Sequence, residues 1–187
     1  MRALPVLPLL LVMLLTACAG EPKAPSAWLK PGVVTRLPAP GIDPAISEQQ
    51  LLTATVQGRQ QSLLVLLNAD RRQLTLVGLS SLGIRLFTLT YDQQGVHTVQ
   101  SVVLPQLPPA GQVLADIMLS YWPSKAWQAV LPAQWTLVDE GDRRRLADPA
   151  GNTVTEIAYA TVAGKRQPVS LDNRVFHYHI VIQHLDG

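Results

Sequence analysis

The chain has 187 residues, of which 48% are hydrophobic and 15% are charged, and its 15 Lys and Arg against 13 Asp and Glu leave a formal charge of +2. This near balance gives no reason to expect a nucleic-acid partner. A single cysteine excludes a disulfide framework, so packing must stabilise the fold. No glycine loop of the kind that cradles phosphates is present, and we expect no cofactor and no metal.

Residues 1–17 have the order of a secretory signal peptide. Met1 and Arg2 open it, and an apolar stretch follows. A stretch of about 14 apolar residues is short for a bilayer span, which needs about 20. An uncleaved anchor helix and a plain secreted protein remain as alternatives.

The end of this segment, Leu15-Thr16-Ala17-Cys18, resembles the lipobox of bacterial lipoproteins. The resemblance implies cleavage before Cys18 and attachment of acyl chains to that cysteine, so lipoprotein-processing and sorting machinery are expected partners. Two or three acyl chains hold a protein stably on a membrane. Ala19 stands where Asp would signal retention in the inner membrane. The expected location is therefore the periplasmic side of the outer membrane.

Residues 18–45 are interrupted by six prolines and three glycines. Such a stretch favours an extended tether of about 3.1 Å per residue. Packing of Trp28 and Leu29 against the domain would shorten its free part. We expect the folded domain itself to span residues 46–187.

The first half of that domain predicts an antiparallel meander. Apolar and polar residues alternate, or apolar residues run together, in short segments separated by turn residues. The expected strands are residues 52–57, 62–68, 73–77, 84–91 and 96–104.

After these strands, the spacing of polar and apolar residues changes to the period of a helix. Between Pro109 and Tyr121, the polar residues Gln112, Asp116 and Ser120 fall on one stripe. A second short helix is expected over residues 124–131, ending at Pro132.

Strands resume after the helices, at residues 135–139, 143–147 and 153–161. A polar loop is expected from Ala163 to Asn173, followed by a last strand over residues 174–184. The predicted fold is mainly β within the α+β class. It is a half-open antiparallel barrel of about 9–11 strands whose concave face is covered by the helical segment.

Catalytic patterns are weak. The segment Gly78–Gly83 has one residue too many for a nucleophile elbow and lies between strands. His177 and His179 share one strand face, but zinc needs at least a third protein ligand. The acidic residues 139, 140 and 142 surround a glycine and indicate a turn. We therefore expect a protein that is not an enzyme.

A concave, mostly apolar surface beside the helix would suit a small ligand. The candidate lining residues are Leu64, Leu66, Leu76, Leu86, Phe87, Leu114, Ile117, Met118, Tyr121, Trp122, Trp127, Phe176, Tyr178 and Ile180. The alternative is that these side chains form a packed core, and the sequence leaves both interpretations open.

Three segments carry a further resemblance. They are residues 78–86 ahead of Tyr91-Asp92, residues 107–123, and residues 144–149 with Gly151. Together, over about Gln49 to the C-terminus, they resemble a family of bacterial lipoproteins of unknown function encoded within aryl polyene or related gene clusters. The layout is also similar to the LolA and LolB lipoprotein carriers, which implies a half-barrel with an apolar cavity for acyl chains.

These observations favour a membrane-anchored lipoprotein that binds or transfers a lipophilic molecule, such as an aryl polyene lipid or an acyl precursor. The alternative is a structural or assembly module that docks on another envelope protein through a sheet edge. An enzyme acting on the lipid is a third, weaker alternative.

Overall fold

The computed structural model describes residues 24–101 and 108–185. The signal peptide, Cys18, the start of the predicted tether and the end of the predicted strand 96–104 lie outside these residues. The strands are β1 (Ser26–Lys30), β2 (Val33–Arg36), β3 (Ile46–Val56), β4 (Arg59–Ala69), β5 (Leu74–Leu79), β6 (Arg85–Asp92), β7 (Gly95–Gln100), β8 (Thr136–Glu140), β9 (Arg143–Ala147), β10 (Thr153–Val162), β11 (Lys165–Asn173) and β12 (Tyr178–His184). The helices are α1 (Ala110–Tyr121) and α2 (Ser124–Gln128).

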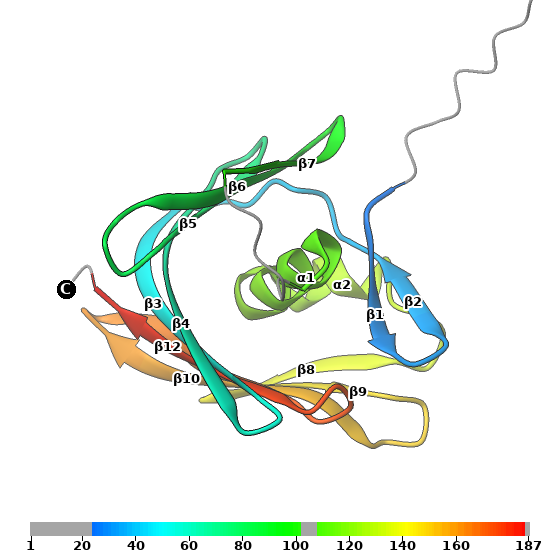
Figure 1. Ribbon diagram of the computed structural model, residues 1–187. Coiled ribbons are helices and arrows are strands. Elements are labelled where there is room, and N and C mark those ends of the chain that lie inside the picture. The colour runs from blue at the N-terminus through cyan, green and yellow to red at the C-terminus, as the bar shows by residue number, and fades with distance from the viewer. Residues whose placement is uncertain (1–23, 102–107, 186–187) are drawn as a thin grey trace, which may run out of the picture.

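Strands β3 to β12 form one antiparallel sheet of ten strands in the order β7-β6-β5-β4-β3-β12-β11-β10-β9-β8. The last strand pairs with β3 and so joins the first five strands to the last five. The sheet curves around α1 without closing, since its edge strands β7 and β8 are not paired with each other in the described chain (Figure 1). A mainly β fold with a large antiparallel sheet and few helices is confirmed. The sequence predicts a half-open barrel, and over the described residues the sheet does not close into a barrel.

Buried and less buried residues alternate along the strands, and the buried ones form the inner face of this sheet. In β5 and β6, Leu76 pairs with Leu89 and Gly78 pairs with Phe87, and all four residues are buried. A side chain at position 78 would collide with the Phe87 ring, so glycine is required for this close approach. The intervening residues of both strands are less buried.

Helix α1 lies inside the curve of the sheet (Figure 1). Leu114, Met118 and Leu119 on its buried face belong to the hydrophobic core. The two large indoles that follow also satisfy their N–H groups. Trp122 donates to the Ala39 carbonyl and Trp127 to the Met118 carbonyl, each at 3.0 Å. Within the described ranges, neither helix has the length and hydropathy needed to cross a bilayer.

Arg144 of β9 ties the end of α1 to the sheet. Its buried guanidinium donates to the carbonyls of Leu119 and Trp122 at 2.7 and 2.8 Å. The last carbonyls of a helix have no partner within it, so this arginine caps them. A bidentate pair with Asp139, at 2.9 and 2.8 Å, holds the other side of the guanidinium.

The described part of the predicted tether differs from that expectation. Residues 26–36 form the β1–β2 hairpin, and Ala27, Leu29 and Leu37 are buried in the core. The backbone of β1 approaches Gly111 of α1 so closely that an alanine there would meet the Ser26 carbonyl. The domain therefore begins before residue 46, because apolar residues between the prolines pack on the helix.

The C-terminal strands also differ from their predicted bounds. The expected loop 163–173 is largely β11, which pairs with both β10 and β12. Residues 174–177 form a turn instead of the start of the last strand. The Asn173 side chain accepts hydrogen bonds from the Val175 and Phe176 N–H groups, and His177 has a φ of 55°. The second helix ends at Gln128, earlier than residue 131.

Candidate ligand-binding site

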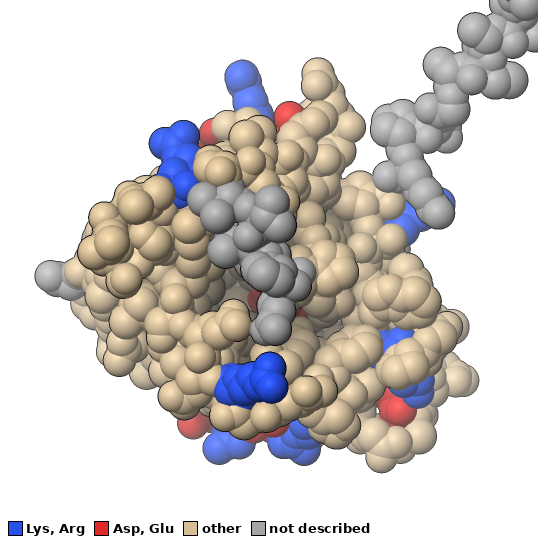
Figure 2. All heavy atoms as spheres, viewed as in Figure 1, with Lys and Arg blue, Asp and Glu red and all other residues tan. Residues whose placement is uncertain are grey.

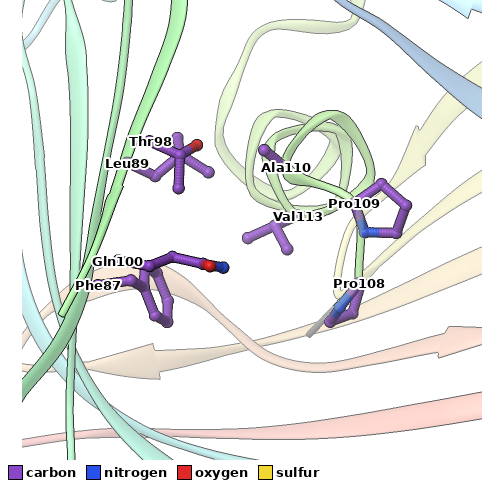
Figure 3. A pocket seen from close by; sticks show the side chains of 8 residues that line it. All are labelled: Phe87, Leu89, Thr98, Gln100, Pro108, Pro109, Ala110 and Val113. Carbon is purple, nitrogen blue, oxygen red and sulfur yellow. The ribbon is translucent and has the colours of Figure 1, made fainter. Parts of the chain in front are cut away.

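A hollow of about 480 Å³ lies between the start of α1 and strands β6 and β7. Ala110 and Val113 point from α1 toward Phe87 and Gln100 across this space (Figure 3). The remaining lining residues are Leu89, Thr98, Pro108 and Pro109. On the face seen in Figure 2, most of the visible Lys, Arg, Asp and Glu side chains lie near the rim.

The inner face of the sheet is not fully covered by α1. Leu52 and Leu63 pair across β3 and β4, and Ile180 of β12 pairs with Ala54. These three large side chains pack against the core but stay partly exposed. Ile117, on the same side of α1 as Val113, is also partly exposed. Apolar surface therefore remains accessible between the helix and the middle of the sheet.

The structure divides the candidate lining residues into groups. Phe87 lines the hollow. Five others are core residues with at most 2% exposure: Leu76, Leu114, Met118, Trp122 and Trp127. Another five are partly buried and pack against the core: Leu86, Ile117, Tyr121, Tyr178 and Ile180.

Leu64 and Leu66 lie on the opposite face of the sheet, so their assignment to a cavity is corrected. Val65 and Leu67 are the inward residues of β4, each 1% exposed. The strand is apolar on both faces, so alternation could not assign its inner side. Phe176 lies in the turn before β12 and not on a strand face.

Sequence reasoning missed several lining residues. Leu89 could have been found, because it shares a strand face with Phe87. Thr98 and Gln100 could be identified only from the register of β6 and β7, in which they pair with Leu89 and Phe87. Val113 needed the position of α1 against β6 and β7, because the helical period alone does not show which of its residues face the hollow.

A partly buried polar cluster stands beside the apolar surface. The Tyr178 hydroxyl lies 2.7 and 2.9 Å from the two carboxylate oxygens of Asp116, to which it donates. Its oxygen accepts from the Asn173 side-chain amide at 3.2 Å and from that of Gln112 at 3.4 Å. The cluster thus joins α1 to β11 and β12.

Burial raises the pKa of Asp116 to about 7, although hydrogen bonds from Tyr178 and Gln112 oppose the shift. Burial, and then the charge of Asp116, raise the pKa of Tyr178, which therefore remains a protonated donor. Among the described residues, no Lys, Arg or His forms an ion pair with Asp116. The carboxyl group is held by neutral donors alone.

A second, smaller pocket of about 190 Å³ lies where β3, β11 and β12 meet. His184 is buried there, with Nε2 at 2.8 Å from the Pro168 carbonyl and Nδ1 at 3.2 Å from Glu48. Gln167 donates to the other oxygen of Glu48 at 2.8 Å. These bonds tie the last strand to its neighbours.

The catalytic patterns considered above form turns and surface pairs. The Ser80 hydroxyl accepts from the Leu82 and Ile84 N–H groups, as in a tight turn. His179 lies 3.8 Å from Asp172, while His177 is exposed in a turn. In the chain as described, no group of three or more His, Cys, Asp or Glu could hold a metal ion.

We compared the chain with known protein families. The profile of a family described as "Protein of unknown function (DUF3261)" matches residues 47–186. The chain belongs to the DUF3261 family. The DUF3261 match covers almost the whole ten-stranded sheet and both helices, whereas the β1–β2 hairpin precedes it.

The DUF3261 chain has no match among curated proteins. Among solved structures it is similar to that of a DUF1329 family protein from Desulfovibrio piger. The two chains share 10% identity with a TM-score of 0.37, over 76% of this chain and 84% of the other.

Proposed function

We propose that this DUF3261 protein is a lipoprotein, anchored through Cys18 at the periplasmic side of the outer membrane, which binds or hands over a lipophilic molecule. The observation that carries the proposal is the hollow of about 480 Å³ between α1 and strands β6 and β7. Its volume falls within the roughly 300–1,000 Å³ of small-molecule sites. The partly exposed inner residues Leu52, Leu63 and Ile180 extend the apolar surface.

The mechanism we propose is passive. Burial of apolar surface contributes about 25 cal/mol per Å², so an acyl or polyene chain entering the hollow needs no chemical step. An aryl polyene lipid or an acyl precursor is the first cargo to test, following the family resemblance. The anchor would keep the hollow close to the membrane that supplies or receives the cargo.

The test is dye binding to a chain that starts at residue 19, exported with a cleavable signal that carries no lipobox. All described elements follow that residue. We expect N-phenyl-1-naphthylamine, a neutral apolar dye, to show a saturable rise in fluorescence. Val113→Trp should weaken binding at least about tenfold, because the indole fills the hollow.

Val138→Trp is the matched control, since Val138 is 44% exposed on edge strand β8 and far in the sheet order from β6 and β7. It should bind the dye like the unmodified chain. Failure of the unmodified chain to bind dye or any co-purified lipid would contradict the proposal.

The competing function is an assembly module that docks on another envelope protein. The exposed Val99, 66% accessible on edge strand β7, favours this alternative. It predicts that Val99→Asp abolishes crosslinks to a neighbour in cells while leaving dye binding unchanged. A carrier would lose function with Val113→Trp instead.

A further inference from the structure

Asp116 is expected to lower the stability of the fold at its position. It lies inside the curve of the sheet, on the helix that the sheet surrounds, and is only partly exposed. Removing a carboxylate from water without a cationic partner costs several kcal/mol. By contrast Asp148, whose side chain is 10% exposed, has such a partner in Lys30 at 3.0 Å.

The hydrogen bonds of the cluster leave the carboxylate unsaturated. An ionised carboxylate offers about four acceptor positions, whereas its donors here are the single Tyr178 hydroxyl proton and the Gln112 side-chain amide. Gln112 and Asn173 donate to the Tyr178 oxygen and so orient that proton toward Asp116. At least one carboxylate oxygen therefore retains acceptor capacity, and the partial exposure of Asp116 gives a donor access to it.

The position of Asp116 connects this capacity with the hollow. Val113 lines the hollow, and Asp116 follows it by one helical turn. Residues three apart on a helix have Cβ atoms about 5–6 Å apart, so the two side chains are neighbours. On the sheet side, Tyr178 is followed on the same face by Ile180, which is partly exposed. A ligand with its apolar chain in the hollow could thus place its polar end at Asp116.

We propose that Asp116 binds the polar head of the ligand and selects amphiphiles whose heads donate hydrogen bonds, with protonated amines bound best, hydroxyls next and carboxylates worst. The proposal rests on the proposed function, because it takes the hollow as the site of the apolar chain. A donor head would supply the missing partner of the carboxylate, whereas a carboxylate head would be repelled by it.

The test is displacement of N-phenyl-1-naphthylamine at pH 8 by three ligands with the same chain: dodecylamine, dodecanol and dodecanoate. We expect dodecylamine to displace the dye at a concentration at least about tenfold lower than dodecanoate, with dodecanol between them. Asp116→Asn keeps an acceptor for Tyr178 but has no charge, and should bring the three ligands within about threefold of one another.

Two matched variants complete the design. Tyr178→Phe keeps the carboxylate and the ring, so it should preserve the order of the ligands. Asp92→Asn removes an acid from the end of β6, at a residue that does not line the hollow, and should also preserve the order. A loss of the order in Asp92→Asn would mean that overall charge, and not Asp116, selects the ligands.

The outcomes separate this inference from the function on which it rests. If the dye binds but the unmodified chain treats the three ligands alike, the role of Asp116 is overturned while the hollow remains a binding site. The same holds if Asp116→Asn folds and keeps the original order. If the unmodified chain binds neither dye nor ligand, the carrier function fails and the head-group proposal fails with it.

Discussion

At the scale of single residues, the carboxyl group of Asp116 connects burial with stability. Its pKa is about 7 in the folded chain, against 3.8 for an unperturbed aspartate. Between these two pH values the folded state holds a proton that the unfolded state has released. Stability contributed by this residue is therefore greatest at low pH and falls as the pH rises through this window.

Replacing Asp116 by asparagine should remove this dependence. Each unit of pKa difference corresponds to about 1.4 kcal/mol, and partial exposure reduces the effect, so we expect a relative gain on the order of 2 kcal/mol for Asp116→Asn between pH 4.5 and pH 8. Urea unfolding of both chains at the two pH values measures it. Parallel changes in the two free energies of unfolding would contradict the assignment.

Arg144 has a structural role that its neighbours in the sequence do not predict. The run Arg143-Arg144-Arg145 in the sequence suggests a solvated basic spot. In the structure the middle arginine points inward, because β9 alternates, and its side chain is 7% exposed against 56% for Arg143. A buried guanidinium is tolerated there since two carbonyls and the Asp139 carboxylate accept its hydrogen bonds.

At the scale of elements, β4 decides which side of the sheet faces the helix. Its inward and outward leucines alternate without a polar residue between Leu63 and Leu67. Pairing with β3 and β5 determines the inner side, since Val65 lies opposite the buried Gln50 and Gly78. A shift by one residue would exchange every side chain of the strand between the two faces.

The neighbouring leucines Leu66 and Leu67 form a matched pair for testing this orientation. Leu67 is 1% exposed in the core, so Leu67→Ala should lower the free energy of unfolding by about 2–5 kcal/mol. Leu66→Ala, on the outer face, should cost clearly less, about 1 kcal/mol, because Leu66 is partly exposed and does not belong to the core. Chemical denaturation of the two variants measures the difference, and equal losses would contradict the register.

At the scale of the whole molecule, the β1–β2 hairpin belongs to the folded unit although the family match begins only at residue 47. Three of its contacts are specific. Leu29 is 3% exposed in the core, Lys30 pairs with Asp148 at 3.0 Å, and the Ser26 backbone packs on Gly111. The hairpin covers a side of α1 that the sheet leaves open (Figure 1).

A chain beginning at residue 38 should therefore be less stable than one beginning at residue 24. Loss of the buried Ala27, Leu29 and Leu37 side chains exposes core surface of α1, and at about 25 cal/mol per Å² we expect a loss of about 3 kcal/mol or more. Thermal unfolding of the two chains measures this, with Trp28→Ala, whose side chain is half exposed, as the control. Equal stability would mean that the segment is the free tether expected from its prolines.

The sequence by itself determined both helices and most of the strands, because periods of 2 and 3.6 are local properties of the chain. It also determined the mainly β class and the amphipathic character of α1. It did not identify β1, β2 and β11, which lie in the predicted tether and loop. Only the tertiary structure decided which strands pair and which residues are buried together, because these depend on contacts between distant parts of the chain. The pairing of β12 with β3 curves the sheet around α1, register brings Gln100 opposite Phe87 to line the hollow, and the same packing buries Asp116 against Tyr178. Burial and strand pairing depend on residues far apart in the sequence, so only the folded chain could place these groups together.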